Sequence, residues 1–114
     1  MSAKITLRQV GDVTVLDVAG RITLGEGSSH LRESIRELLG NGKKKILLNL
    51  SEVSYIDSSG IGELVSGFTS VTNQGGQLKL LNLTKRVRDL LQITKLYTVF
   101  EVFDDEAAAV RSFS

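Results

Sequence analysis

A short apolar run followed by a polar, glycine-rich hexapeptide is the feature that most constrains the fold of this 114-residue chain. Residues 46–50 read Ile-Leu-Leu-Asn-Leu, which is typical of a strand buried on both faces of a parallel sheet. The hexapeptide at residues 57–62 reads Asp-Ser-Ser-Gly-Ile-Gly, and apolar residues then recur with helical spacing at Ile61, Leu64 and Phe68. The segment therefore predicts a strand followed by a helix, with the hexapeptide at the helix N-terminus.

The same alternation of strand and helix patterns continues along the chain. Two alternating segments flank Gly11 and Asp12, which predicts a β-hairpin. We expect strands at residues 5–10, 13–18, 46–50, 78–83 and 98–103, and loops at residues 20–27 and 51–57. The order β-β-α-β-α-β-α-β-α predicts a small α/β domain with a mixed, mostly parallel sheet, an N-terminal antiparallel edge hairpin and about four helices. No linker or repeat interrupts it, so residues 1–114 are expected to form one domain.

Capping residues predict where the helices begin and end. The first helix is expected to be capped by Ser28 or Ser29 and to end at Gly40. Thr84 is expected to cap the third helix, with Ile93 on that helix's apolar face.

Composition argues against several classes of function. Fourteen basic and 13 acidic residues leave a net charge of +1, which gives no general attraction to nucleic acid or to an anionic membrane. The chain has no cysteine and one histidine, which argues against a metal site. It has no apolar run of the ~18 residues that span a bilayer and no signal-peptide pattern at its start. We therefore expect a soluble, cytoplasmic protein without membrane insertion, nucleic-acid partner, cofactor or metal.

The hexapeptide is better suited to receive a phosphate than to break bonds. Asp57 is the expected N-cap, which leaves Ser58 in the first helical turn beside unpaired backbone N–H groups and a partial positive charge. A phosphoryl group there would add a charge of roughly −1.5 to −2 while costing the fold little. A large change of surface charge at small structural cost is what a binary switch requires.

The helix after the hexapeptide has an unusually bare polar face. That face carries Ser59, Gly62, Glu63, Ser66, Ser70 and Asn73. Glycine costs about 1 kcal/mol in a helix interior, yet Gly62 and Gly67 are both present. One interpretation is that a partner protein docks closely against this face. The alternative is that the glycines fit against a neighbouring element of the same fold.

Catalysis is not expected. Ile56 occupies the first glycine position of a Gly-x-Ser-x-Gly elbow around Ser58. The only histidine, His30, lies on a different predicted helix, and an N-cap role explains Asp57 more simply than a role as general base. The glycine pairs at residues 40–42 and 60–62 lack the spacing of nucleotide-binding loops.

Residues 46–62 resemble the signature of STAS domains, and especially that of bacterial anti-sigma factor antagonists. The similarity extends from the opening hairpin to the final helix. The resemblance implies a partner-switching mechanism, in which an anti-sigma factor with serine kinase activity uses ATP to phosphorylate Ser58. The unphosphorylated antagonist would bind that anti-sigma factor and release a sigma factor, and a metal-dependent serine phosphatase would restore binding.

One segment departs from the family pattern. Many antagonists carry Gly-Glu-Leu-Asp after the second strand, where this chain has Gly-Arg-Ile-Thr at residues 20–23. The charge at that contact is reversed at Arg21 and lost at Thr23, which favours a diverged kinase or the alternative of a non-enzymatic STAS subunit in a signalling scaffold or lipid-transport complex. The candidate partner-binding residues are Asp57, Ser59, Gly60, Gly62, Glu63, Ser66 and Thr23.

Overall fold

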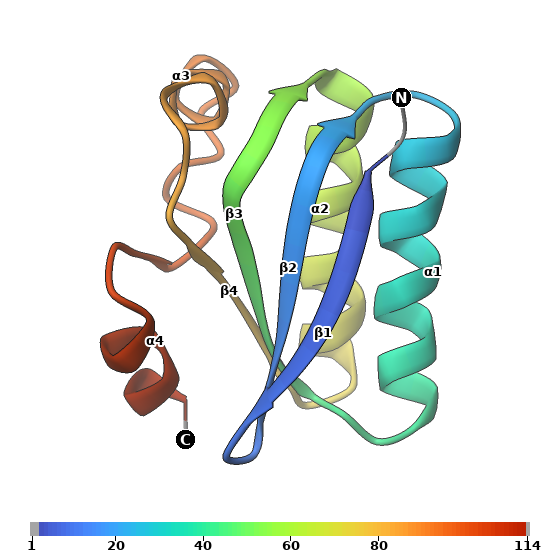
Figure 1. Ribbon diagram of the computed structural model, residues 1–114, viewed down its shortest axis with the longest axis vertical. Coiled ribbons are helices and arrows are strands. Elements are labelled where there is room, and N and C mark those ends of the chain that lie inside the picture. Colours follow the sequence, from blue (N-terminus) through green and yellow to red (C-terminus); the bar gives the residue numbers. More distant parts are fainter. Residues whose placement is uncertain (1–2, 114) are drawn as a thin grey trace.

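The computed structural model describes residues 3–113, and its nine elements follow the predicted order (Figure 1). The strands are β1 (Lys4–Val10), β2 (Val13–Ile22), β3 (Lys45–Ile56), β4 (Gln77–Leu81) and β5 (Val102–Phe103). The helices are α1 (Glu26–Gly40), α2 (Ser58–Asn73), α3 (Lys85–Ile93) and α4 (Glu106–Ser112). The strands lie in the sheet in chain order, β1 antiparallel to β2 and every other pair parallel. This confirms the predicted α/β domain with an antiparallel edge hairpin.

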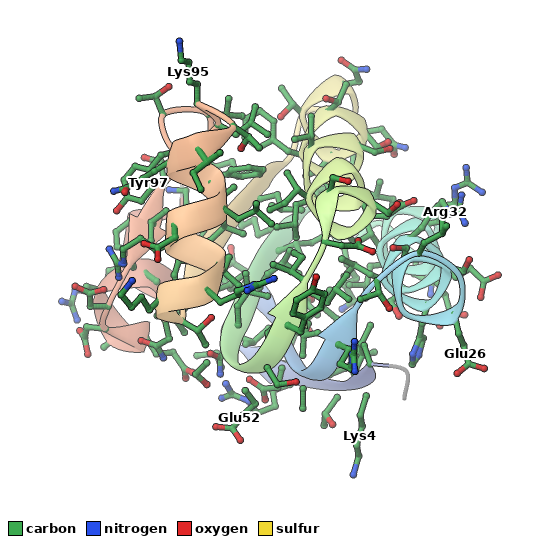
Figure 2. The ribbon with its side chains drawn as sticks, turned by 90° about the horizontal axis from the view of Figure 1, so that it is seen from above. Lys4, Glu26, Arg32, Glu52, Lys95 and Tyr97 are labelled. Carbon is green, nitrogen blue, oxygen red and sulfur yellow. The ribbon has the colours of Figure 1, made fainter. Side chains whose placement is uncertain are left out.

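The helices cover the two faces of the sheet unequally. Because β-α-β crossovers are right-handed and the strand order advances in one direction, α1 and α2 fall on the same face. Figures 1 and 2 show them side by side there, whereas α4 lies across the opposite face. The main core lies under α1, α2 and α3 and includes Leu16, Leu48, Leu64 and Leu91. A smaller apolar cluster lies between the sheet and α4, and its buried members are Val13, Val15, Leu47, Leu81 and Ala109.

Polar contacts fix both ends of the short helix α4. Arg8 of β1 forms ion pairs with Asp17 of β2 and with Glu106, the latter at 2.7 Å. Hydrogen bonds from the Arg8 guanidinium hold the pKa values of both carboxyls below their usual range. At the other end, the Lys79 side chain, only 5% exposed, donates to the Ser112 carbonyl at 2.9 Å. A cation at a helix C-terminus is favoured by the helix dipole, so these contacts hold α4 on the sheet.

Two predicted loops contain strand. The expectation of loops at residues 20–27 and 51–57 is wrong over residues 20–22 and 51–56, because β2 continues to Ile22 and β3 to Ile56. Val53 and Ile56 are buried whereas residues 51, 52 and 54 are exposed, so the end of β3 has one covered and one open side. The last strand is shorter than predicted and comprises only Val102–Phe103, after turns at residues 97–99.

The predicted cap of the first helix is wrong. The N-cap is Gly25, whose φ of 98° favours glycine, and α1 begins at Glu26. Ser28 lies buried inside the first turn, where its hydroxyl donates to the Thr23 carbonyl at 2.8 Å. The Glu26 carboxylate is instead the group that complements the helix dipole. The expected end of this helix at Gly40 is confirmed.

The third helix is predicted correctly in its cap but not in its apolar face. The Thr84 hydroxyl oxygen accepts a hydrogen bond from the Val87 backbone N–H at 3.3 Å, which confirms the N-cap. Ile93 is 75% exposed, so its assignment to the buried face is wrong. Ile93 ends α3, beyond the last turn that packs on the core.

Among residues 3–113, no helix has the length and apolar content needed to cross a membrane.

Candidate functional site

Asp57 organises the N-terminus of α2. Its backbone is extended, with φ −110° and ψ −175°, and one carboxylate oxygen accepts from the Gly60 N–H at 2.9 Å, which confirms the predicted N-cap. The other oxygen accepts from the Leu24 N–H at 3.1 Å. Burial acts to raise the pKa of Asp57, but the backbone N–H hydrogen bonds outweigh it and hold that pKa below its usual value. The charged carboxylate therefore links α2 to the loop after β2.

The first turn of α2 lies directly against the end of β2. The Asp57 N–H donates to the Ile22 carbonyl at 3.3 Å. A Cβ atom on Gly60 would lie 2.3 Å from that carbonyl oxygen and 2.6 Å from the Ile56 side chain. Only glycine fits at residue 60, so Gly60 contributes the close approach that positions the helix end. Its assignment as a partner contact stays a prediction.

Ser58 is the accessible hydroxyl of the hexapeptide. It is exposed and is the first residue of α2, whereas Ser59 is half-buried. Within residues 3–113, the Ser58 hydroxyl makes no hydrogen bond, since the cap is supplied by Asp57. The Ser58 hydroxyl is therefore accessible for modification on a fixed helix end, where backbone N–H groups favour an anion.

Gly62 and Gly67 of α2 have different surroundings. Apart from its chain neighbours and the nearby helix backbone, no atom of residues 3–113 lies within 4 Å of a Cβ atom placed on Gly62, which is exposed. A Cβ atom on Gly67 would lie 2.7 Å from the Ile35 side chain of α1. Internal packing therefore explains Gly67, and it does not explain Gly62.

The remaining predicted site residues lie along the same end and face. Glu63 is half-buried, and its carboxylate lies 3.8 Å from the Arg32 guanidinium of α1. Ser66 is exposed one turn further along α2. Thr23 is half-buried, and its carbonyl accepts from both the N–H and the hydroxyl of Ser28. The structure thus brings Thr23 close to Asp57 through the neighbouring Leu24.

Leu24 is a surface residue that sequence reasoning missed. Its side chain is 80% exposed, although its backbone N–H is held by Asp57. An exposed large apolar side chain on the residue that Asp57 binds offers a contact that a protein partner can bury. The available signal was a leucine inside a glycine-bearing loop, where no apolar periodicity requires it for the core.

The described residues do not assemble a catalytic group around Ser58. The His30 Nδ1 atom lies 3.0 Å from the Ala3 carbonyl, to which it can donate, and His30 forms no contact with Ser58 within residues 3–113. Both Asp57 carboxylate oxygens accept backbone N–H groups. No cluster of three metal-ligating side chains occurs in the part of the chain that the structure describes.

Comparisons with known proteins agree with the fold. The chain is 33% identical over 102 residues to the anti-sigma-B factor antagonist of Bacillus subtilis, covering 90% of this chain and 92% of the relative. A Thermotoga maritima protein, provisionally identified as an anti-sigma factor antagonist, superposes with a TM-score of 0.88 at 26% identity, covering 96% and 93% of the two chains.

A third relative shares the fold at lower identity. The Bacillus protein SpoIIAA, solved in its phosphorylated form, superposes with a TM-score of 0.75 at 22% identity, over 95% of this chain and 97% of that one. The family model of the STAS domain matches residues 4–109, which is nearly the whole chain. The chain therefore belongs to the STAS-domain family.

Proposed function

We propose that this chain is an anti-sigma factor antagonist that works by partner switching. In its unphosphorylated form it binds an anti-sigma factor with serine kinase activity and thereby releases a sigma factor. Phosphorylation of Ser58 weakens that binding, and a serine phosphatase restores it. The chain itself, acting in the cytoplasm as one STAS domain over residues 1–114, catalyses nothing.

The observation that carries this proposal is the Ser58 hydroxyl, which is exposed on a fixed helix end and has no partner among residues 3–113. Its neighbours Asp57 and Gly60 are held by the fold, so a kinase can reach Ser58 without unfolding the helix. The name of the Bacillus subtilis relative, an anti-sigma-B factor antagonist, supports the same class of function.

A phosphate on Ser58 would change binding chiefly through charge. It would add roughly −1.5 to −2 beside the Asp57 carboxylate, while the N-terminus of α2 would stabilise it. The surface around Ser58, Leu24 and Gly62 would change from weakly charged to strongly anionic. A partner that fits the first state is then repelled by the second, and it loses contact with the exposed Leu24 side chain.

Titration calorimetry with the anti-sigma factor kinases of the source organism tests the switch. The wild type and Ser58→Ala should bind the cognate kinase, and Ser58→Glu should bind it at least about tenfold more weakly, which corresponds to about 1.4 kcal/mol. Thr98→Glu is the matched control, because Thr98 is exposed in the turn before β5 and lies outside α2. Equal binding by Ser58→Glu and Thr98→Glu would contradict the proposal.

The alternative function is that of a non-enzymatic STAS subunit in a signalling scaffold or lipid-transport complex. Arg21 favours it, because a basic residue stands where many antagonists are acidic. Size-exclusion chromatography of cell extracts separates the two functions. A stable large assembly that persists after Ser58 phosphorylation would favour the subunit, and a small species whose partner changes on phosphorylation would favour the antagonist.

A further inference from the structure

Two arginines from different elements contact one tyrosine ring at the end of β3. The Arg21 guanidinium carbon lies 5.2 Å from the centre of the Tyr55 ring, and the Arg86 guanidinium carbon lies 4.3 Å from it. Arg21 is the in-register partner of Tyr55 in β2, whereas Arg86 lies in the first turn of α3. We call these three residues the Arg-Tyr-Arg cluster.

The cluster carries positive charge that the fold does not neutralise. Both arginines are exposed, and neither forms an ion pair with any residue between 3 and 113. Their neighbour Lys85, by contrast, pairs with Asp89 at 2.7 Å. Glu52 lines the same shallow hollow as Arg86 without pairing with it in the described structure. The ring quadrupole of Tyr55 attracts the two cations but leaves their charge available.

The position of Arg86 is electrostatically unfavourable for α3 itself. The N-terminus of a helix carries a partial positive charge, which favours acidic and disfavours basic side chains in the first turn. The first turn of α3 has no acidic residue and instead carries Lys85 and Arg86. A bound anion would stabilise this helix end and would reduce the repulsion between the two guanidinium charges. Residues 3–113 therefore place no paired acidic group against these two arginines, although this surface favours one.

We propose that the Arg-Tyr-Arg cluster binds an acidic segment of a protein partner. The cluster is continuous with the Ser58 surface, because Arg21 precedes Ile22, whose carbonyl accepts from the Asp57 N–H. Guanidinium groups bind carboxylates in bidentate geometry, and two of them beside one ring fit consecutive acidic side chains. This inference rests on the proposed function only in taking that end of the molecule as the partner-binding end.

Titration of the full chain with a hexaglutamate peptide, followed by NMR, tests the proposal directly. The Nε–H signals of Arg21 and Arg86 and the ring signals of Tyr55 should shift at saturable peptide concentration, and added salt should weaken the effect. The double variant Arg21→Gln/Arg86→Gln should bind at least about fivefold more weakly. Lys43→Gln/Lys44→Gln is the matched control, since it removes the same charge from exposed positions at the opposite end of β3. That control should bind like the wild type.

Equal weakening in the two double variants, or no shift of the arginine signals, would overturn the proposal. An equal response of these signals to vesicles containing phosphatidylserine would overturn the assignment to a protein partner. Thermal melts of both double variants establish that each is folded. The titration does not involve phosphorylation, because it contains neither a kinase nor ATP. Failure of the switch at Ser58 and failure of the acidic-segment proposal are therefore separate results.

Discussion

Placing the same alanine at two glycines of the hexapeptide should have opposite effects on stability. In Gly60→Ala the new methyl group would lie 2.3 Å from the Ile22 carbonyl oxygen and 2.6 Å from the Ile56 side chain. In Gly62→Ala, two residues further along α2, none of the described residues outside the adjoining part of the same helix lies within 4 Å of the new methyl group. Comparing these two variants distinguishes a glycine that packing requires, Gly60, from a glycine that is exposed, Gly62.

The expected magnitudes follow from these contacts. Overpacking of a well-packed site costs about 1–3 kcal/mol, and Gly60→Ala falls at the upper end because a backbone carbonyl cannot move aside as a side chain can. Gly62→Ala should instead raise the free energy of unfolding by up to about 1 kcal/mol, since alanine is the better helix former. The two variants should therefore differ by about 2–4 kcal/mol.

Urea denaturation followed by circular dichroism measures this difference. With a denaturant dependence of about 1–3 kcal/mol per molar urea, the two midpoints should be separated by roughly 1 M or more. An unchanged denaturant dependence would indicate that neither variant alters the amount of surface that unfolding exposes. If Gly60→Ala were as stable as Gly62→Ala, the first turn of α2 would not be docked on the end of β2 as described, and the account of the site would be wrong.

Three further changes test other parts of the structure. Asp57→Ala removes the cap of α2 and its link to the β2 loop, so urea denaturation should show a loss of about 1–2 kcal/mol; an unchanged midpoint would refute that role. Gly62→Lys should not lower the free energy of unfolding but should weaken binding of the anti-sigma factor in calorimetry, and a destabilised protein would mean that Gly62 is packed internally. Because Arg8 lowers the folded-state pKa values of Asp17 and Glu106, the folded state binds fewer protons than the unfolded chain. This stabilisation is complete above about pH 5 and is lost as the pH falls through the depressed values. Between about pH 2 and 5, the free energy of unfolding should fall less steeply with decreasing pH in Arg8→Met than in the wild type. Identical slopes in the two proteins would contradict the assignment.

The element order and the position of the hexapeptide were predictable because they depend on local patterns. Apolar periodicity distinguishes the strand at residues 46–50 from the helix that begins at Ser58. The caps at Asp57 and Thr84 follow from side chains that can accept a hydrogen bond from the next turn. Gly25 shows the limit of that reasoning, since a positive φ and the dipole preference of Glu26 begin α1 there although serines follow nearby.

Features that join distant segments were not predictable from one sequence. Polar residues dominate the end of β3, which makes this segment resemble a loop in the sequence, although Val53 and Ile56 mark its covered side. The Arg-Tyr-Arg cluster joins residues from β2, β3 and α3, and no spacing along the chain indicates that they meet. The packing of Gly67 against Ile35 likewise depends on how α1 and α2 approach each other. Such contacts follow from tertiary packing, which overrides local preference.

Site mapping of phosphate after incubation with ATP and each anti-sigma factor kinase of the source organism tests the central claim most directly. Intact mass followed by peptide sequencing should find one phosphate, on Ser58, and Ser58→Ala should take up none. Phosphate on Ser59 or elsewhere in the wild type, or no phosphate with any of these kinases, would contradict the switch at Ser58.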